Sequence, residues 1–122
     1  EMKKVLFLLL FLIFPLIANA GDKWSKTNIS LEVAYQTLHL VDFSQTLQIA
    51  EQPEKYHEKN PILGKYPPRE MAYAYFIGGA ILHFAVSYFL PEPYRTAWQS
   101  STIIIQLPIV GGNFQLGLGF KF

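Results

Sequence analysis

The stretch from Met71 to Leu90 reads MAYAYFIGGAILHFAVSYFL and contains no Asp, Glu, Lys or Arg. Twenty residues of this kind match the length that an α-helix needs to cross the hydrocarbon core of a bilayer. Pro91-Glu92-Pro93 follows directly and ends the helix, because proline cannot continue it. The small residues Ala74 and Gly78 lie four apart and allow a second helix to approach closely. The stretch therefore predicts a transmembrane helix over residues 71–90, with a buried core helix of a soluble protein as the alternative.

The N-terminus has the three parts of a secretion signal. Met2-Lys3-Lys4 is basic, Val5 to Ile17 is apolar, and Ala18-Asn19-Ala20 is a small-residue cleavage pattern. The apolar run is shorter than the roughly 20 residues of a spanning helix. We expect a signal peptide over residues 1–20, cleaved after Ala20, with a retained anchor as the alternative.

The other segments complete the predicted fold. Residues 29–50 contain no Pro or Gly, and residues 94–110 are polar in their first half and apolar in their second, with Pro108 and Gly111-Gly112 closing that helix. Residues 113–122 alternate apolar and polar side chains, which is a strand period. The fold class is therefore all-α: a small bundle of about three transmembrane helices (29–50, 71–90 and 94–110) after a signal peptide. The prediction is one helical membrane domain over residues 21–122, ending in a short extended tail, 113–122.

Charge and cysteine content narrow the class of protein. The net charge is +1, so the chain has no excess of positive charge that would attract nucleic acid. It contains no cysteine, which excludes a cysteine-linked lipid anchor, a cysteine-attached haem and a Cys-ligated zinc. Basic residues concentrate on the cytoplasmic side of membrane proteins. The connector 51–70 carries Lys55, Lys59, Lys65 and Arg69. We therefore expect this connector in the cytoplasm and the turn at residues 91–95 outside.

A polar stripe follows the first predicted helix. At 100° per residue, its members fall within about 120° of one helix face. Burying polar groups at membrane depth costs free energy unless they face the interior of a helical bundle. The stripe therefore predicts contact with His83 on the next helix. The stripe consists of Glu32, Gln36, His39, Asp42 and Thr46.

Three interpretations of the stripe remain open. Asp42 and His83 pair as a structural hydrogen bond, or the polar groups pass a proton or an ion, or His39, Asp42 and His83 together bind a divalent metal such as zinc or iron. The structural pair is the preferred interpretation, with no cofactor. The sequence contains no H-E-x-x-H, G-x-S-x-G or phosphate-binding glycine loop.

Two motifs resemble a pattern in small membrane proteins of bacteria and their phages. The motifs are Asp42-Phe43-Ser44-Gln45-Thr46, of the form D-x-x-Q-T, and Glu58 to Gly64, of the form E-x-N-P-x-L-G. The similarity spans roughly residues 35–90. It implies a compact helical membrane protein with no established activity. It adds Gln45 to the polar cluster and marks Glu58, Asn60 and Pro61 as a connector motif. The notable physical feature of that motif is that Asn60-Pro61 initiates a turn, and that Glu58 or Asn60 can reach amides at a helix terminus.

The expected function is that of a non-enzymatic accessory or assembly subunit in the bacterial inner membrane, surrounded by lipid and associated with a protein partner or a second copy. One alternative is a membrane-embedded metal- or proton-handling protein that uses His39, Asp42 and His83. Another is a soluble periplasmic helical protein that binds a partner through its aromatic surface. The periplasm and the outer membrane are the alternative locations.

Overall fold

A computed structural model describes residues 3–4 and 23–120, so the predicted cleavage site lies outside the described residues. Residues 23–120 form three helices and no strand: α2 (Lys26–Glu51), α3 (Arg69–Phe89) and α4 (Tyr94–Gln115). The all-helical prediction is confirmed, and the three helices correspond to the predicted segments, each with somewhat different bounds.

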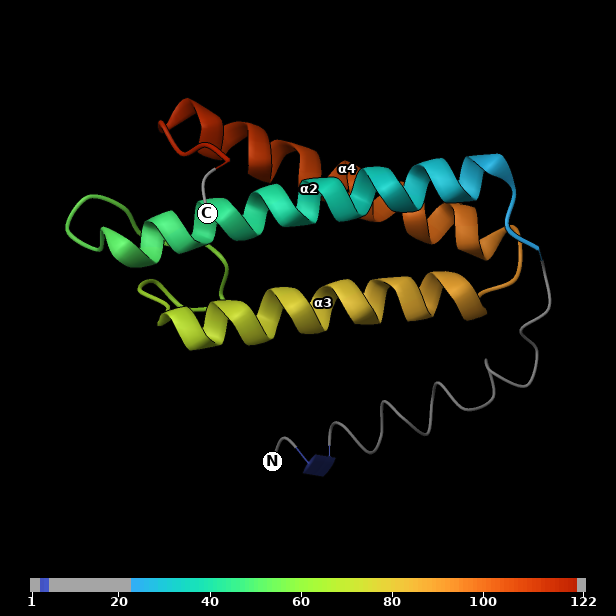
Figure 1. Ribbon diagram of the computed structural model, residues 1–122, viewed down its shortest axis with the longest axis horizontal. Coiled ribbons are helices and arrows are strands. Elements are labelled where there is room, and N and C mark those ends of the chain that lie inside the picture. The colour runs from blue at the N-terminus through green and yellow to red at the C-terminus, as the bar shows by residue number, and fades with distance from the viewer. Residues whose placement is uncertain (1–2, 5–22, 121–122) are drawn as a thin grey trace.

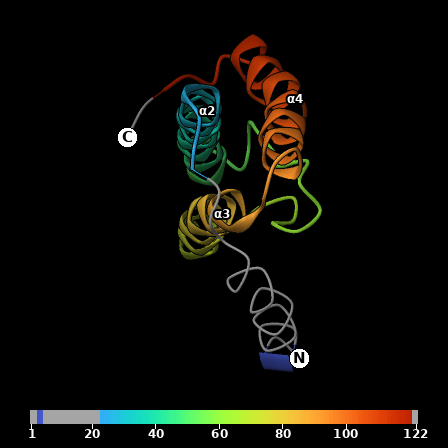
Figure 2. The same ribbon diagram turned by 90° about the vertical axis from the view of Figure 1, so that its right-hand side faces the viewer.

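Successive helices run antiparallel to one another (Figure 1). Seen along their axes, they occupy the corners of a triangle (Figure 2). α2 packs against both neighbours, more extensively against α4 than against α3, while α3 and α4 touch least. The 52–68 connector covers one end of the bundle, and the short turn between α3 and α4 lies at the other. Side chains on α2 therefore decide what the interior of the bundle contains.

α2 begins earlier than the sequence predicts because Ser25 caps it. The Ser25 hydroxyl accepts a hydrogen bond from the Asn28 amide at 3.0 Å, and the Asn28 side chain accepts one from the Ser25 amide at 3.1 Å. This reciprocal capping box satisfies two amides at the helix start. Asn28 is thus the third residue of the helix.

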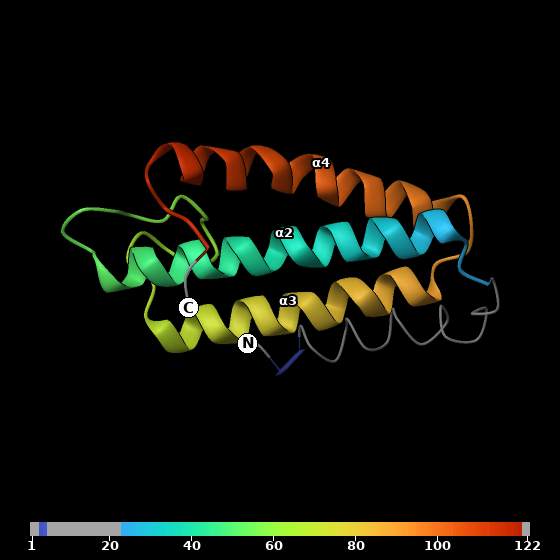
Figure 3. The same cartoon turned by 45° about the horizontal axis from the view of Figure 1, so that its top comes forward.

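The predicted extended tail is wrong over residues 113–115, because α4 continues through them. Gly111-Gly112 does not end the helix, since Gln45 on α2 holds the last turn through the Val110 carbonyl and the Asn113 side chain. The stop is Gly117, which has a φ of 94°. Around it, the Gly117 amide donates to the Phe114 carbonyl and the Leu118 amide to the Asn113 carbonyl, a helix-terminating pattern that favours glycine. Beyond it the chain turns back across α2 (Figure 3).

The interior of the bundle is more polar than its surface. Among the described residues, an apolar cluster fills only the connector end, and it consists of Phe43, Leu47, Leu63, Ala72 and Phe76. Elsewhere the buried side chains are mainly polar or charged: Asn28, Glu32, His39, Ser44, Gln45, Thr46, His83, Ser87, Arg95, Gln99 and Gln106. Large apolar side chains instead cover the outside, among them Ile81 at 66% and Ile104 at 68% exposure.

Within the described residues, α3 is the one helix that length and composition allow to cross a membrane. In its apolar stretch, 22% of the residues are buried, so most of them face outward. α2 and α4 are long enough to cross a membrane, but they contain too many polar residues to be candidate spans by composition. The structure therefore supports three helices and one candidate span.

Candidate functional site

The centre of the polar interior is the Glu32 carboxylate, which is 5% exposed. Four side chains from all three helices donate to it. The donors are His83 Nδ1 at 2.9 Å, Ser87 Oγ at 2.7 Å, Gln99 Nε2 at 3.1 Å and Gln36 Nε2 at 2.8 Å. A carboxylate that accepts this many bonds is satisfied without water, which is the condition for burying it.

His83 is held at both nitrogens and by two stacked aromatic rings. Its Nδ1 donates to Glu32, since a carboxylate only accepts, and its Nε2 lies 2.8 Å from the Thr102 hydroxyl on α4. The Tyr35 ring stacks on one side with centroids 3.5 Å apart, and the Trp98 ring stacks at 5.0 Å. The imidazole therefore joins α2, α3 and α4 at a single point.

The order Thr102–His83–Glu32 is that of a hydroxyl, a base and an orienting carboxylate. The Thr102 hydroxyl, however, also lies 2.9 Å from the Trp98 carbonyl and 3.0 Å from the Gln99 carbonyl of its own helix. If its single proton goes to a carbonyl, His83 Nε2 must be the donor and the ring is an imidazolium. The hydrogen bonds therefore fit two states that differ by one proton: a neutral ring to which Thr102 donates, and an imidazolium that donates to Thr102. His83 joins the three helices in both states.

The network continues to the turn between α3 and α4. Asn28 Nδ2 donates to Glu92 Oε1 at 2.8 Å and to Gln99 Oε1 at 3.1 Å, and Gln99 returns a bond to the Asn28 carbonyl at 3.1 Å. Partial desolvation raises the pKa of Glu92. Hydrogen bonds from Thr96 and Asn28 outweigh that effect, so its pKa lies below the usual range. The turn is thus tied to the beginning of α2.

Arg95 closes the same end of the bundle. Its guanidinium is 1% exposed and donates to the Ser87 carbonyl at 2.7 Å and the Tyr88 carbonyl at 3.3 Å. These carbonyls belong to the last turn of α3, where a cation is favourable because of the helix dipole. Its face lies over the Trp24 ring at 5.5 Å.

The predicted pair of Asp42 and His83 is wrong. Asp42 accepts a hydrogen bond of 2.6 Å from Gln106 on α4, and the carboxylate beside His83 is that of Glu32. Asp42 is ten residues beyond Glu32, or about 15 Å along the helix. Because α2 and α3 are antiparallel, that distance moves Asp42 away from the level of His83 and towards the connector.

The predicted metal set is also not brought together. His39 Nε2 donates to the Phe76 carbonyl at 2.8 Å, so this nitrogen is not available to a metal. Nowhere in residues 3–4 and 23–120 do three or more His, Asp or Glu side chains form a group that could hold a metal ion. Gln36 does point inward as predicted, donating to Glu32 and to the Ala80 carbonyl at 3.0 Å.

The connector motif binds the bundle and itself. Glu58 accepts from Thr46 Oγ1 at 3.1 Å and from two connector amides, those of Lys59 and Asn60, and not from amides at a helix terminus. Asn60 donates to the Tyr75 hydroxyl at 2.9 Å, and its side-chain oxygen accepts from the Ile62 amide across Pro61. The motif thus ties the connector to both α2 and α3.

Several residues of the network were not predicted from the sequence, although their spacing along the chain was visible. Ser87 follows His83 by one helical turn and so shares its face. Gln99 and Thr102 are three apart in the polar half of α4. Their spacing placed them on one face, but which helix that face met depended on the packing.

The chain was compared with known proteins. No protein-family model, no curated protein and no solved structure matches it.

Proposed function

We propose that this protein is a non-enzymatic integral membrane subunit of three spanning helices. The observation that supports it most is the inverted distribution of polarity, with polar side chains inside the bundle and large apolar side chains outside. Water drives the opposite arrangement in a soluble bundle, whereas lipid accepts apolar surface and penalises exposed polar groups.

The positions of the charges support the same proposal. Between residues 27 and 50 the acidic side chains are Glu32 and Asp42, and both are hydrogen-bonded to other helices. Residues 71–89 and 96–115 hold no Asp, Glu, Lys or Arg. These two acidic groups of α2 are therefore paired with other helices of the bundle, as intramembrane ionisable groups require.

The polar network suits an assembly role. Since lipid and apolar side chains are similarly hydrophobic, helices in a bilayer associate through close packing and hydrogen bonds. Glu32 and His83 supply such bonds to all three helices, and the exposed apolar surface contacts lipid, a protein partner or a second copy. We propose the bacterial inner membrane as the location, with residues 1–20 as its signal peptide.

Membrane extraction and thiol labelling test this proposal. The chain contains no cysteine, so each introduced cysteine is a single reporter. The protein should resist extraction with alkaline carbonate. In intact cells an impermeant thiol reagent should label Glu92→Cys and leave Lys59→Cys unlabelled. Release by carbonate would instead favour a soluble periplasmic protein, and labelling of Lys59→Cys alone would reverse the proposed topology.

The Thr102–His83–Glu32 chain supports proton handling as a second candidate. Its hydrogen bonds fit either a neutral or a protonated His83 ring inside the bundle, and these two states differ by one proton. Proteoliposomes containing the purified protein would then carry a proton flux that Glu32→Gln abolishes. A flux equal to that of empty liposomes would exclude this function.

A further inference from the structure

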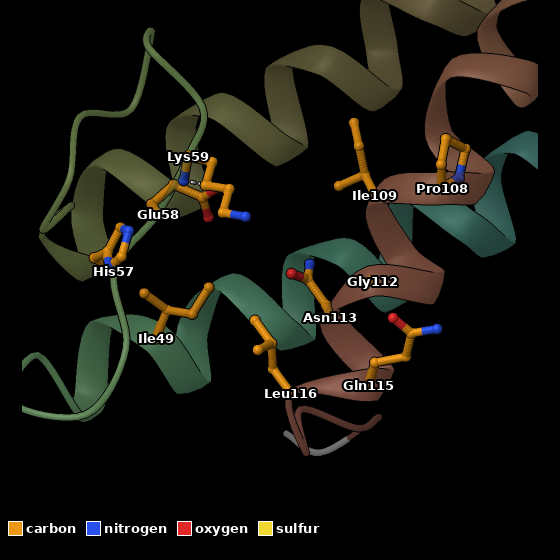
Figure 4. A pocket seen from close by; sticks show the side chains of 10 residues that line it. All are labelled: Ile49, His57, Glu58, Lys59, Pro108, Ile109, Gly112, Asn113, Gln115 and Leu116. Carbon is orange, nitrogen blue, oxygen red and sulfur yellow. Dashed lines mark hydrogen bonds between the residues drawn. The ribbon is translucent and has the colours of Figure 1, made fainter.

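A cavity of about 450 Å³ lies at the connector end, between the connector, the end of α2 and the last turns of α4. Its volume falls within the range of small-molecule sites, about 300–1,000 Å³. Figure 4 shows Lys59 and Glu58 on one side, Ile109 and Asn113 on the opposite side, and Ile49 and Leu116 beneath. None of the polar network around Glu32 lines it.

α4 contributes a glycine to the lining of this cavity. Gly112 lies on the wall, and a Cβ added at that position would meet no atom within 4 Å. A larger residue would fill the space without a backbone clash. Gly111 also has nothing within 4 Å but does not line the cavity, so it offers a matched comparison.

The walls are apolar and the mouth carries a cation. Ile49, Ile109 and Leu116 supply hydrocarbon, while Lys59 extends its amine across the space towards α4 (Figure 4). The neighbouring carboxylate of Glu58 accepts from Thr46 and from connector amides, and no ion pair joins it to Lys59 among the described residues. Glu58 keeps its negative charge, but its oxygens already accept from the protein's own donors, whereas the Lys59 amine has no ion pair within the part of the chain that the structure describes. Lys59 is therefore the charged group that the cavity leaves available to an anionic ligand.

We propose that this cavity binds one anionic phospholipid, with the phosphate against the Lys59 ammonium and an acyl chain along Ile109 and Leu116. The inference rests on the proposed membrane location. There, the connector lies at headgroup depth and α4 runs from it towards the bilayer interior. Lys59 at the connector and Ile109, six residues before the end of α4, match the two ends of a lipid, and Leu116 lies after them in the sequence, nearer the chain end.

Native mass spectrometry of the full chain in mild detergent tests the site, after delipidation and addition of phosphatidylglycerol or phosphatidylcholine. The wild type should retain one phosphatidylglycerol in preference to phosphatidylcholine. Gly112→Leu should lose it and Gly111→Leu should keep it. Lys59→Gln should weaken retention about fivefold, as expected for about 1 kcal/mol per cation near anionic lipid. Lys55→Gln, in the same connector but outside the cavity lining, should have no effect.

Equal retention of the two lipids, or equal retention by the two glycine variants, would overturn the site. Circular dichroism of both variants establishes that they are folded. Failure of the site is distinguishable from failure of the membrane proposal: a chain that resists carbonate but retains no phosphatidylglycerol refutes the site alone, whereas release by carbonate refutes the membrane location.

Discussion

The contact between Glu32 and His83 makes a quantitative prediction for a double-mutant cycle. His83 Nδ1 donates to Glu32 at 2.9 Å, and the two side chains are 2% and 6% exposed. A hydrogen bond to a charged group contributes about 1.5–3 kcal/mol. We therefore expect Glu32→Ala and His83→Ala to couple by that amount. The double mutant should be less destabilised than the sum of the single mutants.

Most of the stability lost in Glu32→Ala should come from His83, because His83 loses its main hydrogen-bond acceptor. The other donors keep a second acceptor when the carboxylate is removed: Ser87 retains the His83 carbonyl, Gln99 the Asn28 carbonyl and Gln36 the Ala80 carbonyl. His83 Nδ1 retains only the Ser87 hydroxyl at 3.5 Å. Breaking one partner out of a buried ion pair costs about 3–5 kcal/mol, which sets the expected upper range for Glu32→Ala.

Unfolding of the detergent-solubilised protein by sodium dodecyl sulfate, followed by far-ultraviolet circular dichroism, measures these free energies. The control cycle pairs Asp42→Ala with His83→Ala, which should add within about 0.5 kcal/mol because the residues share no hydrogen bond. The reasoning is refuted if Glu32 and His83 are additive within that margin, or if Asp42 and His83 couple as strongly.

Three further predictions use the same titration. A Cβ on Gly79 would lie 3.1 Å from a His39 ring atom, so Gly79→Ala should destabilise the protein by about 1 kcal/mol or more. A Cβ on Gly78 would meet open space, so Gly78→Ala should be neutral or stabilising. Equal effects of the two substitutions would contradict this packing. Asp42→Ala leaves the buried Gln106 amide without its acceptor and should lower the free energy of unfolding by about 1–3 kcal/mol. Asp42→Asn keeps an acceptor oxygen and should lower it by less. Equal losses would contradict this hydrogen bond. The pKa of Glu92 is depressed in the folded state, so its contribution is complete above the unfolded value of about 4.3 and is lost as the pH falls through the folded pKa. Glu92→Gln should therefore flatten the loss of stability below about pH 4, and an unchanged profile would contradict the assignment.

The sequence by itself determined the helices and their polar face. The uncharged run of residues 71–90 and the prolines after it predicted α3 to within two residues at either end. The spacing of Glu32, Gln36 and His39 predicted that they share a face directed at other helices, and the structure places all three against α3 or α4. Both features depend on local spacing along one chain segment, and that spacing is visible without a partner.

Only the tertiary structure decided which residues meet. The sequence offered His83 two carboxylates, Glu32 and Asp42, and the antiparallel register of α2 and α3 selected Glu32. That register depends on the packing of all three helices and on contacts with Gln99 and Thr102 of α4, none of which is local. The tail shows the same limit. Gly111-Gly112 reads as a helix stop, but α4 continues to Gln115, held by hydrogen bonds that Gln45, far away in sequence, donates to Val110 and accepts from Asn113.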